Sequence, residues 1–210
     1  MTSAAAAVAT ALRARIAIDD AAFDRLYPDH VARLSGLHWT PVSVALRATA
    51  LLAPEPGMRV LDVGAGPGKL CCVGAAARAG TWRGIERDPA LVAIAVETAR
   101  LLEVDHKIRF DAGDALAVDW RGFDSVYLYN PFESQLFGGS FARTAAGAAL
   151  ADQVERTRAR LDELAPGTRV VTFHGFGGDM PPGFTRVAIE ATESPTTIPG
   201  GELALWIKRA

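Results

Sequence analysis

One stretch, residues 60–69 with the sequence Val-Leu-Asp-Val-Gly-Ala-Gly-Pro-Gly-Lys, constrains the fold of this chain more than any other. Its first four residues are typical of a buried strand, and the alanine-rich run over 70–79 favours a helix. Between them, the alternate glycines Gly64, Gly66 and Gly68 allow a sharp turn and let a ligand lie against bare main chain. The first amides of a helix also attract acceptor groups. The stretch predicts the first strand–turn–helix unit of a nucleotide-binding fold.

Strand and helix patterns alternate after this turn. This implies a mainly parallel sheet with helices on both faces, as in other α/β proteins. The last two strands are joined by a Thr/Pro/Gly loop and predict a final antiparallel pair, so seven strands are expected in all. The expected strands cover residues 58–63, 81–86, 107–111, 125–129, 168–174, 184–191 and 203–208, and the expected helices cover 68–79, 89–102 and 142–164.

The first 53 residues show a different, helical pattern. A weak helical signal covers 1–18, and a second helix over 21–37 is interrupted near its Tyr-Pro pair. Thr40 is a good N-cap for a third helix over 41–52, because a threonine hydroxyl accepts a hydrogen bond from a free helix amide. These helices precede the first strand and are not needed to build the sheet. We therefore interpret residues 1–53 as a cap over its ligand edge, and 54–210 as one Rossmann-like domain.

Composition narrows the classes of protein. The chain has 210 residues, 50% of them hydrophobic, and a formal net charge of −2, so it lacks the basic excess of nucleic-acid-binding surfaces. No apolar run reaches membrane-spanning length, and no positive charge precedes the alanine-rich start, so we expect a cytoplasmic protein. The two cysteines, Cys71 and Cys72, are neighbours in a helix. We expect buried thiols there, with neither a disulfide nor a metal site.

The glycine turn, together with an acid at the end of the next strand, resembles the class I S-adenosylmethionine-dependent methyltransferases. The resemblance spans about residues 58–210 and includes the closing strand pair. Dinucleotide dehydrogenases usually have G-x-G-x-x-G, whereas this chain has G-x-G-x-G with Lys69 at the dehydrogenases' third glycine position. The resemblance therefore implies S-adenosyl-L-methionine as the cofactor. An NAD-dependent oxidoreductase and a non-catalytic binding or scaffold protein are the alternatives.

The same resemblance implies which residues meet the methionine and ribose parts of the cofactor. Gly64, Ala65 and Gly66 would form the loop under these parts, followed by Gly68 at the helix start. Asp62 would order this loop or meet the amino group of the cofactor. Glu86 would accept hydrogen bonds from both ribose hydroxyls, because a carboxylate has two oxygens for two donors.

On the adenine side, the resemblance implies that Asp114 lies near the adenine amino group and that Ala115 supplies a backbone amide. Arg87, which follows the ribose-binding acid, is included in the expected cofactor site. For Asp114, a plain loop acid is the alternative interpretation.

The sequence after the fourth strand resembles the Asn/Asp-Pro-Pro-Tyr/Phe motif of methyltransferases that act on nitrogen. Here it is Asn130-Pro131-Phe132, with one proline instead of two. By resemblance, the Asn130 carbonyl would hold the N–H groups of the acceptor, and the ring of Phe132 would pack against it. Positioning of this kind suits methyl transfer, which needs in-line approach. A simple turn after the strand is the alternative.

Other residues carry two interpretations each. His174 ends the fifth expected strand and is either a general base at the substrate site or a structural strand-end residue. His38 and Trp39 either close over the cofactor or belong to an ordinary capping loop. Lys69 is either exposed in the first helical turn or reaches a substrate carboxylate.

These patterns predict an enzyme that methylates a nitrogen on a small molecule or a protein side chain. The near-neutral charge gives an RNA acceptor no support. We expect no membrane association and a monomer or a homodimer.

Overall fold

The computed structural model describes residues 3–129, 140–192 and 201–210, with side chains described in these ranges except at 3 and 140–148. Seven strands form one sheet in the order β3-β2-β1-β4-β5-β7-β6. Strand β7 runs antiparallel to β5 and β6, and the other neighbouring pairs are parallel. The predicted fold class is therefore confirmed. The strands are β1 Arg59–Val63, β2 Thr81–Glu86, β3 Ile108–Ala112, β4 Ser125–Tyr129, β5 Arg169–Phe173, β6 Phe184–Ala191 and β7 Glu202–Lys208.

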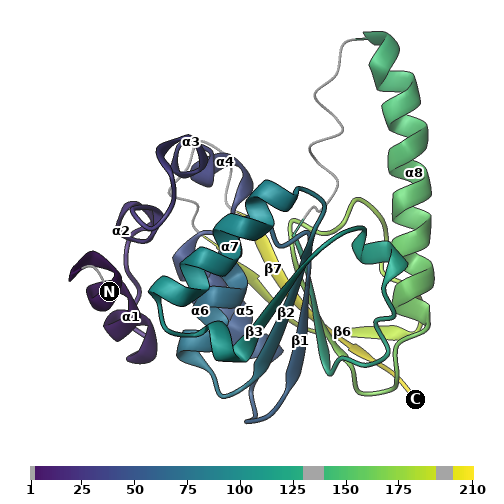
Figure 1. The fold of residues 1–210 in the computed structure, drawn as a ribbon. Helices are drawn as coiled ribbons and strands as arrows, with labels where there is room; N and C mark the ends of the chain where they lie inside the picture. Colours follow the sequence, from purple (N-terminus) through teal and green to yellow (C-terminus); the bar gives the residue numbers. More distant parts are fainter. Residues whose placement is uncertain (1–2, 130–139, 193–200) are drawn as a thin grey trace.

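Helices cover both faces of the sheet, as expected for parallel strands joined by helical crossovers. One face is covered by α5, α6 and α7, with α1 packed on the outer side of α6, and the other face by α8 with the short helix η2 (Figure 1). The bounds are α1 Ser3–Arg13, α2 Asp20–Asp24, α3 Asp29–Ala32, α4 Ser35–His38, α5 Val42–Leu52, α6 Lys69–Ala77, α7 Pro89–Leu101, α8 Ser140–Asp162, and the 3-10 helices η1 Asp105–Lys107 and η2 Ala115–Ala117.

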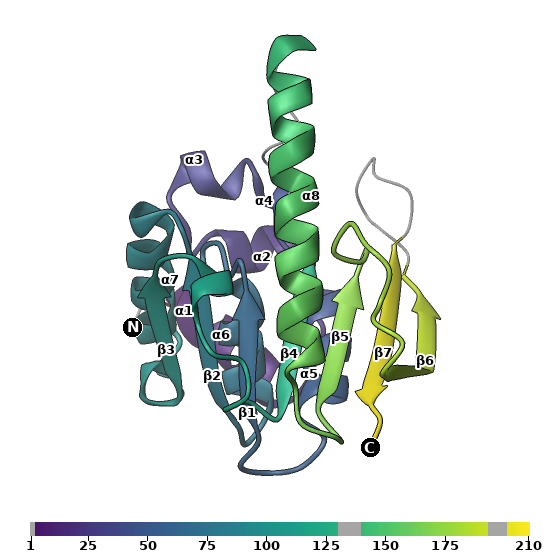
Figure 2. The ribbon, with the colours of Figure 1, turned by 90° about the vertical axis from the view of Figure 1, so that its right-hand side faces the viewer.

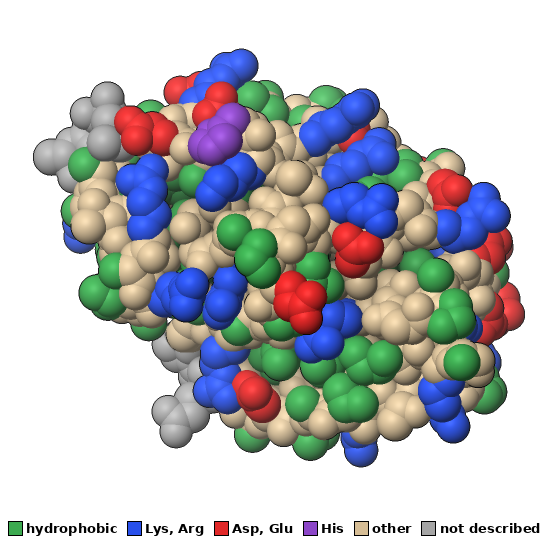
Figure 3. Space-filling view, turned by 90° about the horizontal axis from the view of Figure 1, so that it is seen from below, with side chains coloured by type: hydrophobic (Ala, Val, Ile, Leu, Met, Phe, Trp, Pro, Cys, Tyr) green, Lys and Arg blue, Asp and Glu red, His purple; other side chains and the backbone are tan. Residues whose placement is uncertain are grey.

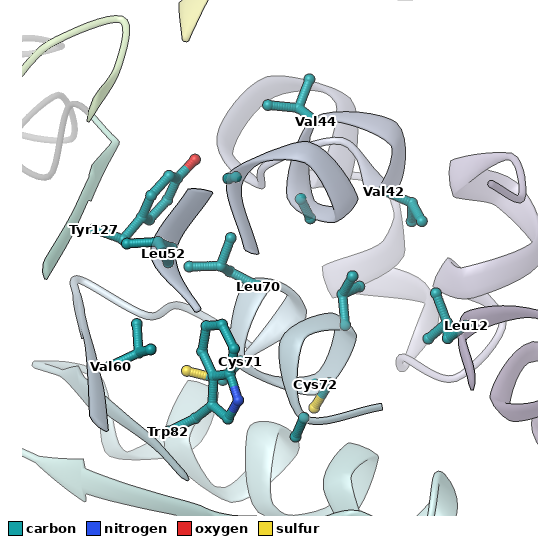
Figure 4. Packing of buried hydrophobic residues seen from close by; sticks show 14 of the residues in the cluster. Leu12, Val42, Val44, Leu52, Val60, Leu70, Cys71, Cys72, Trp82 and Tyr127 are labelled. Carbon is teal, nitrogen blue, oxygen red and sulfur yellow. The ribbon is translucent and has the colours of Figure 1, made fainter. Parts of the chain in front are cut away.

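The larger hydrophobic core lies between the sheet and the helices of the first face. It joins α1 and α5 to α6 and the strands, so the N-terminal helices share a core with the sheet (Figure 4). Both cysteines lie in this core and are fully buried, as predicted. The labelled members in Figure 4 are Leu12, Val42, Val44, Leu52, Val60, Leu70, Cys71, Cys72, Trp82 and Tyr127.

Helix α6 consists almost entirely of small or apolar residues because it lies directly against the sheet. A Cβ at Gly74 would overlap the ring of Trp82 from β2. The helix therefore approaches the sheet closely only because glycine stands at this position. This close approach fixes where α6 begins, and hence the position of the glycine turn that precedes it.

The N-terminal segment differs in part from its predicted form. Instead of one interrupted helix, the three short helices α2, α3 and α4 occupy residues 20–38. Helix α5 begins at Val42, and Thr40 makes no N-cap bond to it. Its hydroxyl instead lies 2.9 Å from the hydroxyl of Tyr127 in β4. A tertiary hydrogen bond thus replaces the local one that the sequence suggested.

Different parts of the first 53 residues occupy different places. Helices α1 and α5 contact α6 on the face of the sheet, whereas Trp39 and Thr40 line a pocket at its carboxyl edge. We call residues 20–40 the cap segment. The division of the chain at residue 53 stays a prediction.

The carboxyl ends of the parallel strands share one edge, which points upward in Figure 2, and α8 projects beyond that edge. Seen from below, the opposite end of the molecule carries Lys and Arg side chains interspersed with acidic and hydrophobic ones (Figure 3). Among the described helices, none has the length and apolar character needed to cross a membrane.

Candidate functional site

A pocket lies where β1 and β4 end, between the glycine turn and the cap segment. Pockets of open α/β sheets that bind ligands lie at this edge, beyond the carboxyl ends of the strands. The turn, the cap segment and β4 each supply part of the lining. The lining residues are His38, Trp39, Thr40, Asp62, Gly64, Ala65, Pro67, Lys69, Leu70, Tyr127 and Tyr129.

The glycine turn needs its glycines for backbone reasons. Gly64, Gly66 and Gly68 have φ values of 76°, 53° and 81°, in the left-handed region that side chains disfavour. The amides of Gly64 and Ala65 both donate to the carbonyl of Ile85 at the end of β2, at 3.0 Å. The predicted strand–turn–helix unit is thus present, with the turn fastened to the neighbouring strand.

The last two glycines have different neighbours. A Cβ at Gly66 would lie 2.8 Å from the ring of Trp39, in the cap segment. A Cβ at Gly68 would lie 2.6 Å from Phe110 in β3 and 2.8 Å from Ala95 in α7. Protein side chains therefore fill the space beside Gly68, and this glycine serves the packing of α6 against its neighbours. Its predicted contact with the cofactor stays a prediction.

Glu86 binds the glycine turn from the end of β2. Its Oε2 accepts a hydrogen bond from the Gly66 amide at 3.0 Å, and its Oε1 accepts one from the Asp88 amide at 3.0 Å. A carboxylate offers about four acceptor positions, so each oxygen can accept a further donor. Glu86 thus combines a structural contact to the turn with free acceptor capacity at the edge of the sheet.

Asp62 is a buried carboxyl group in the wall of the pocket, with 3% of its surface exposed. The thiol of Cys71 donates to its Oδ2 at 3.5 Å. Burial, with a smaller contribution from Glu86, raises the pKa of Asp62 to about 7, although the Cys71 hydrogen bond opposes this shift. The group therefore changes charge near neutral pH, and a cation in the pocket would favour its ionised form.

The cap segment supplies an aromatic and polar wall. Trp39 lies over Gly66, and its ring N–H donates to the Val31 carbonyl at 3.4 Å. Behind it, the hydroxyl of Tyr127 pairs with Thr40, and burial raises the pKa of Tyr127 well above its ordinary value. The tyrosine therefore stays neutral. His38 and Trp39 both line the pocket, and their closure over the cofactor stays a prediction.

Lys69 does not have the exposed side chain of its first predicted role. It is buried, with 2% of its side chain exposed, and its ammonium group lies within the cap segment. Nζ donates to Asp20 Oδ1 at 2.8 Å and to Ser35 Oγ at 2.6 Å. Asp24 Oδ1 lies 2.7 Å away as a close ion pair, outside hydrogen-bond angles. The expectation of an exposed lysine was wrong because the cap segment covers the start of α6.

On the other side of the turn, Asp114 is held by several donors. Its Oδ1 accepts from the Leu116 amide at 3.0 Å, and its Oδ2 accepts from Arg156 of α8 at 3.0 Å. Arg87 lies 3.4 Å from Oδ1. Partial burial alone would raise the pKa of Asp114, but these donors hold it below its ordinary value. Arg87, which was expected in the cofactor site, is thus a partner of Asp114.

None of the predicted adenine-side residues lines the pocket described above. Ala115 is buried, and its carbonyl accepts a hydrogen bond from Trp120 at 2.9 Å. The residues around Asp114 lie at the ends of β2 and β3, on the far side of the glycine turn. Their roles at the cofactor, like those of the other site residues, stay predictions.

The predicted substrate side is described only in part. Asn130, Pro131 and Phe132 lie outside the described residues. His174 follows β5 in a left-handed conformation with φ of 56°, and its exposed ring lies 4.3 Å from Phe173 and 5.9 Å from Tyr129, centroid to centroid. Since Tyr129 lines the pocket, His174 stands next to its wall.

Two residues of the pocket were not among the expected site residues, although they carry a recognisable signal. Tyr127 and Tyr129 are two apart in β4, so both side chains point to the same face of the sheet. They come directly before the expected substrate motif.

Among the described residues, no group of three or more His, Cys, Asp or Glu side chains is placed to hold a metal ion.

Comparison with known proteins gives one family match. Residues 54–156 match a model described as a methyltransferase domain. The match covers the glycine turn, the predicted ribose and adenine acids, and the first part of α8. It confirms the predicted resemblance. A search of curated proteins finds no match.

Solved structures share the fold at low sequence identity. TrmN from Thermus thermophilus has a TM-score of 0.63 and 21% identity over 80% of this chain and 49% of the other, so this chain spans about half its length. An RNA methyltransferase from Salinibacter ruber in complex with S-adenosyl-L-homocysteine has a TM-score of 0.57 and 24% identity, over 81% of this chain and 93% of the other. A mutant of MtNAS in complex with S-adenosylmethionine has a TM-score of 0.56 and 15% identity, over 98% of this chain and 75% of the other. At this identity the likeness shows the fold.

Proposed function

We propose that the chain is a class I S-adenosylmethionine-dependent methyltransferase, and that it methylates a nitrogen atom of a small molecule or of a protein side chain. The observation that carries this proposal is the position of the pocket. It joins the glycine turn to Tyr129, and the next three residues in the sequence are Asn130-Pro131-Phe132. One cavity thus connects the expected cofactor loop to the strand that leads into the expected acceptor motif.

The residues around the turn fit the cofactor. The exposed Gly64 offers bare main chain, and Glu86 has acceptor positions for hydroxyl groups. Asp62 offers a carboxylate for an ammonium group. When bound, S-adenosyl-L-methionine supplies an electrophilic methyl group on a sulfonium cation. These side chains would bind and orient it.

The chain's own contribution to the reaction is positioning and exclusion of water. Trp39, Tyr127 and Tyr129 place aromatic rings around the pocket, and such rings favour a cation. In the proposed reaction, the Asn130 carbonyl accepts a hydrogen bond from an N–H group of the acceptor. This hydrogen bond orients the lone pair of the acceptor nitrogen. Methyl transfer needs this alignment more than it needs acid–base catalysis.

Calorimetric titration with S-adenosyl-L-methionine tests the cofactor directly, with NAD(H) as the comparison. Asn130→Ala should lower turnover at least about tenfold, since a lost positioning contact is worth about 1.4 kcal/mol or more. Its dissociation constant for the cofactor should stay within about twofold. Equal turnover of the variant and the natural protein would remove the Asn-Pro-Phe motif from the mechanism.

An RNA acceptor is a second candidate, because the Salinibacter ruber structure is described as an RNA methyltransferase. The net charge of −2 does not favour it. Transfer of a labelled methyl group into cell extract, with and without prior ribonuclease treatment, separates the two. Loss of label after ribonuclease would favour RNA, and retention of label in the small-molecule or protein fraction would favour the main proposal. An extract without any label would indicate a non-catalytic binding protein.

A further inference from the structure

Lys69 is the most completely buried charged residue among those described, and it occupies the first position of α6, directly after the glycine turn. An ammonium group has three N–H donors. Three oxygens surround it, from Asp20, Asp24 and Ser35, all in the cap segment and all within 2.8 Å. The ring of Phe23, also in the cap segment, lies 5.4 Å from Nζ.

This arrangement directs the charge of Lys69 toward the cap segment. Burial of an unpaired charge is costly, so the lysine and its two carboxylates depend on one another. Asp20 continues the connection, because its Oδ1 also accepts the amide of Val42 at the start of α5. The ammonium group thus connects the helix that follows the turn to Asp20, at the start of the cap segment, and to Ser35 further along it.

The remainder of the cap segment reaches the pocket. From Ser35, which accepts a hydrogen bond from Lys69, the chain continues through α4 to Trp39. The ring of Trp39 lies over Gly66, where a Cβ would come within 2.8 Å of it. Thr40 then pairs with Tyr127 at 2.9 Å. The cap segment therefore forms one wall of the pocket while Lys69 holds its base.

We propose that Lys69 is a positioning residue of the cofactor site, acting through the cap segment to hold Trp39 over the glycine turn. This inference rests on the proposed function, since it takes the pocket beside the turn as the cofactor site. Lys69 does not itself bind the cofactor in this proposal, because Asp20, Asp24 and Ser35 of the cap segment surround its ammonium group. Substitution of Lys69 should therefore affect cofactor binding only to the extent that it displaces Trp39 from the glycine turn.

The experiment measures binding of S-adenosyl-L-homocysteine by calorimetry, without any acceptor. Lys69→Met removes the charge and keeps a long side chain. Arg83→Met is the matched control, because it breaks the Arg83–Asp111 ion pair of 2.6 Å between β2 and β3, outside the cap segment. We expect about tenfold weaker binding for Lys69→Met and a change below about twofold for the control.

A double-variant cycle separates positioning from general loss of stability. Trp39→Ala alone should also weaken binding about tenfold. If Lys69 acts through Trp39, the double variant should again be about tenfold weaker, whereas independent effects would multiply to about a hundredfold. Hydrogen exchange gives a second readout: the amides of His38 and Trp39, which donate within the cap segment, should exchange faster in Lys69→Met than in Arg83→Met.

Unchanged binding by a folded Lys69→Met variant, or a hundredfold effect of the double variant, would overturn the inference and leave the proposed function intact. If the natural protein itself binds no S-adenosyl-L-homocysteine, the proposed function fails first. Should Lys69→Met not fold by circular dichroism, Asp24→Asn, which weakens the same cluster and keeps its shape, decides by the same criteria.

Discussion

The two sides of the glycine turn are both rich in charge, but they use it differently. On the cap side, Lys69 and its partners are buried, with 2% of the lysine side chain exposed. On the strand side, the ion pairs of Asp114 are open to water, with side-chain exposures of 50% for Arg87 and 42% for Arg156. Water and salt screen exposed pairs strongly and buried pairs weakly.

The difference in burial suggests a different role for the charges on each side of the turn. On the cap side, the contacts that hold the pocket wall are buried. The strand side presents Glu86 and Asp114 at an open edge, where ligand groups can compete for their oxygens. Changes on the cap side should therefore alter both stability and binding, whereas exposed charges on the strand side should affect stability little.

The largest effect expected is a pH dependence set by Asp62. The unfolded chain loses this proton near pH 4, whereas the native chain keeps it up to about pH 7. Between these values the native state binds more protons, so stability falls as pH rises, by up to about 4 kcal/mol. Asp62→Asn should flatten this fall in urea unfolding measured from pH 4.5 to 8. Parallel curves for the two proteins would show that Asp62 ionises normally.

The second prediction concerns the packing beside Gly68. Gly68→Ala should cost about 3 kcal/mol of unfolding free energy, because a left-handed φ and a clash with Phe110 and Ala95 add up. Gly57→Ala is its control, since Gly57 has a similar φ of 83° but nothing within 4 Å of a Cβ. It should cost about 1 kcal/mol. Equal losses of unfolding free energy for the two variants, measured by thermal unfolding, would mean that the neighbours of Gly68 move aside without strain.

The third prediction concerns the acid at the end of β2. Glu86→Gln should weaken cofactor binding roughly 30-fold, about 2 kcal/mol, because a neutral amide loses charge-assisted hydrogen bonds and offers one acceptor oxygen instead of two. Calorimetry with S-adenosyl-L-homocysteine measures the effect. The same change at Glu97, exposed on α7, should leave binding unaltered. Binding by Glu86→Gln as tight as that of the natural protein would remove Glu86 from the site.

The smallest effect is expected at Arg156, which links α8 to Asp114. Arg156→Ala should lower the unfolding free energy by about 0.5 kcal/mol or less, as for other exposed ion pairs. Urea unfolding at low and high salt measures it, and the small difference should shrink further as salt increases. A loss of several kcal/mol would mean that both sides of the turn depend equally on their charges.

The amino-acid sequence predicted the sheet well because its signals are local. Alternating apolar runs, turn glycines and the bounds of β2, β4 and β6 follow from residues close together in the chain. The acid at the end of β2 was identified for the same reason. The buried state of Cys71 and Cys72 followed from their place in a small-residue helix.

Only the tertiary structure decided which residues meet around the turn. Lys69 and Asp20 are separated by 49 positions, and Thr40 and Tyr127 by 87. No local pattern marks such pairs, and a lysine in a first helical turn is usually exposed. Its burial became visible only when the cap segment was placed over α6. The sequence therefore determined the turn and its neighbouring strands, whereas long-range packing decided the wall that encloses the pocket, because the energy of that wall lies in contacts between distant segments.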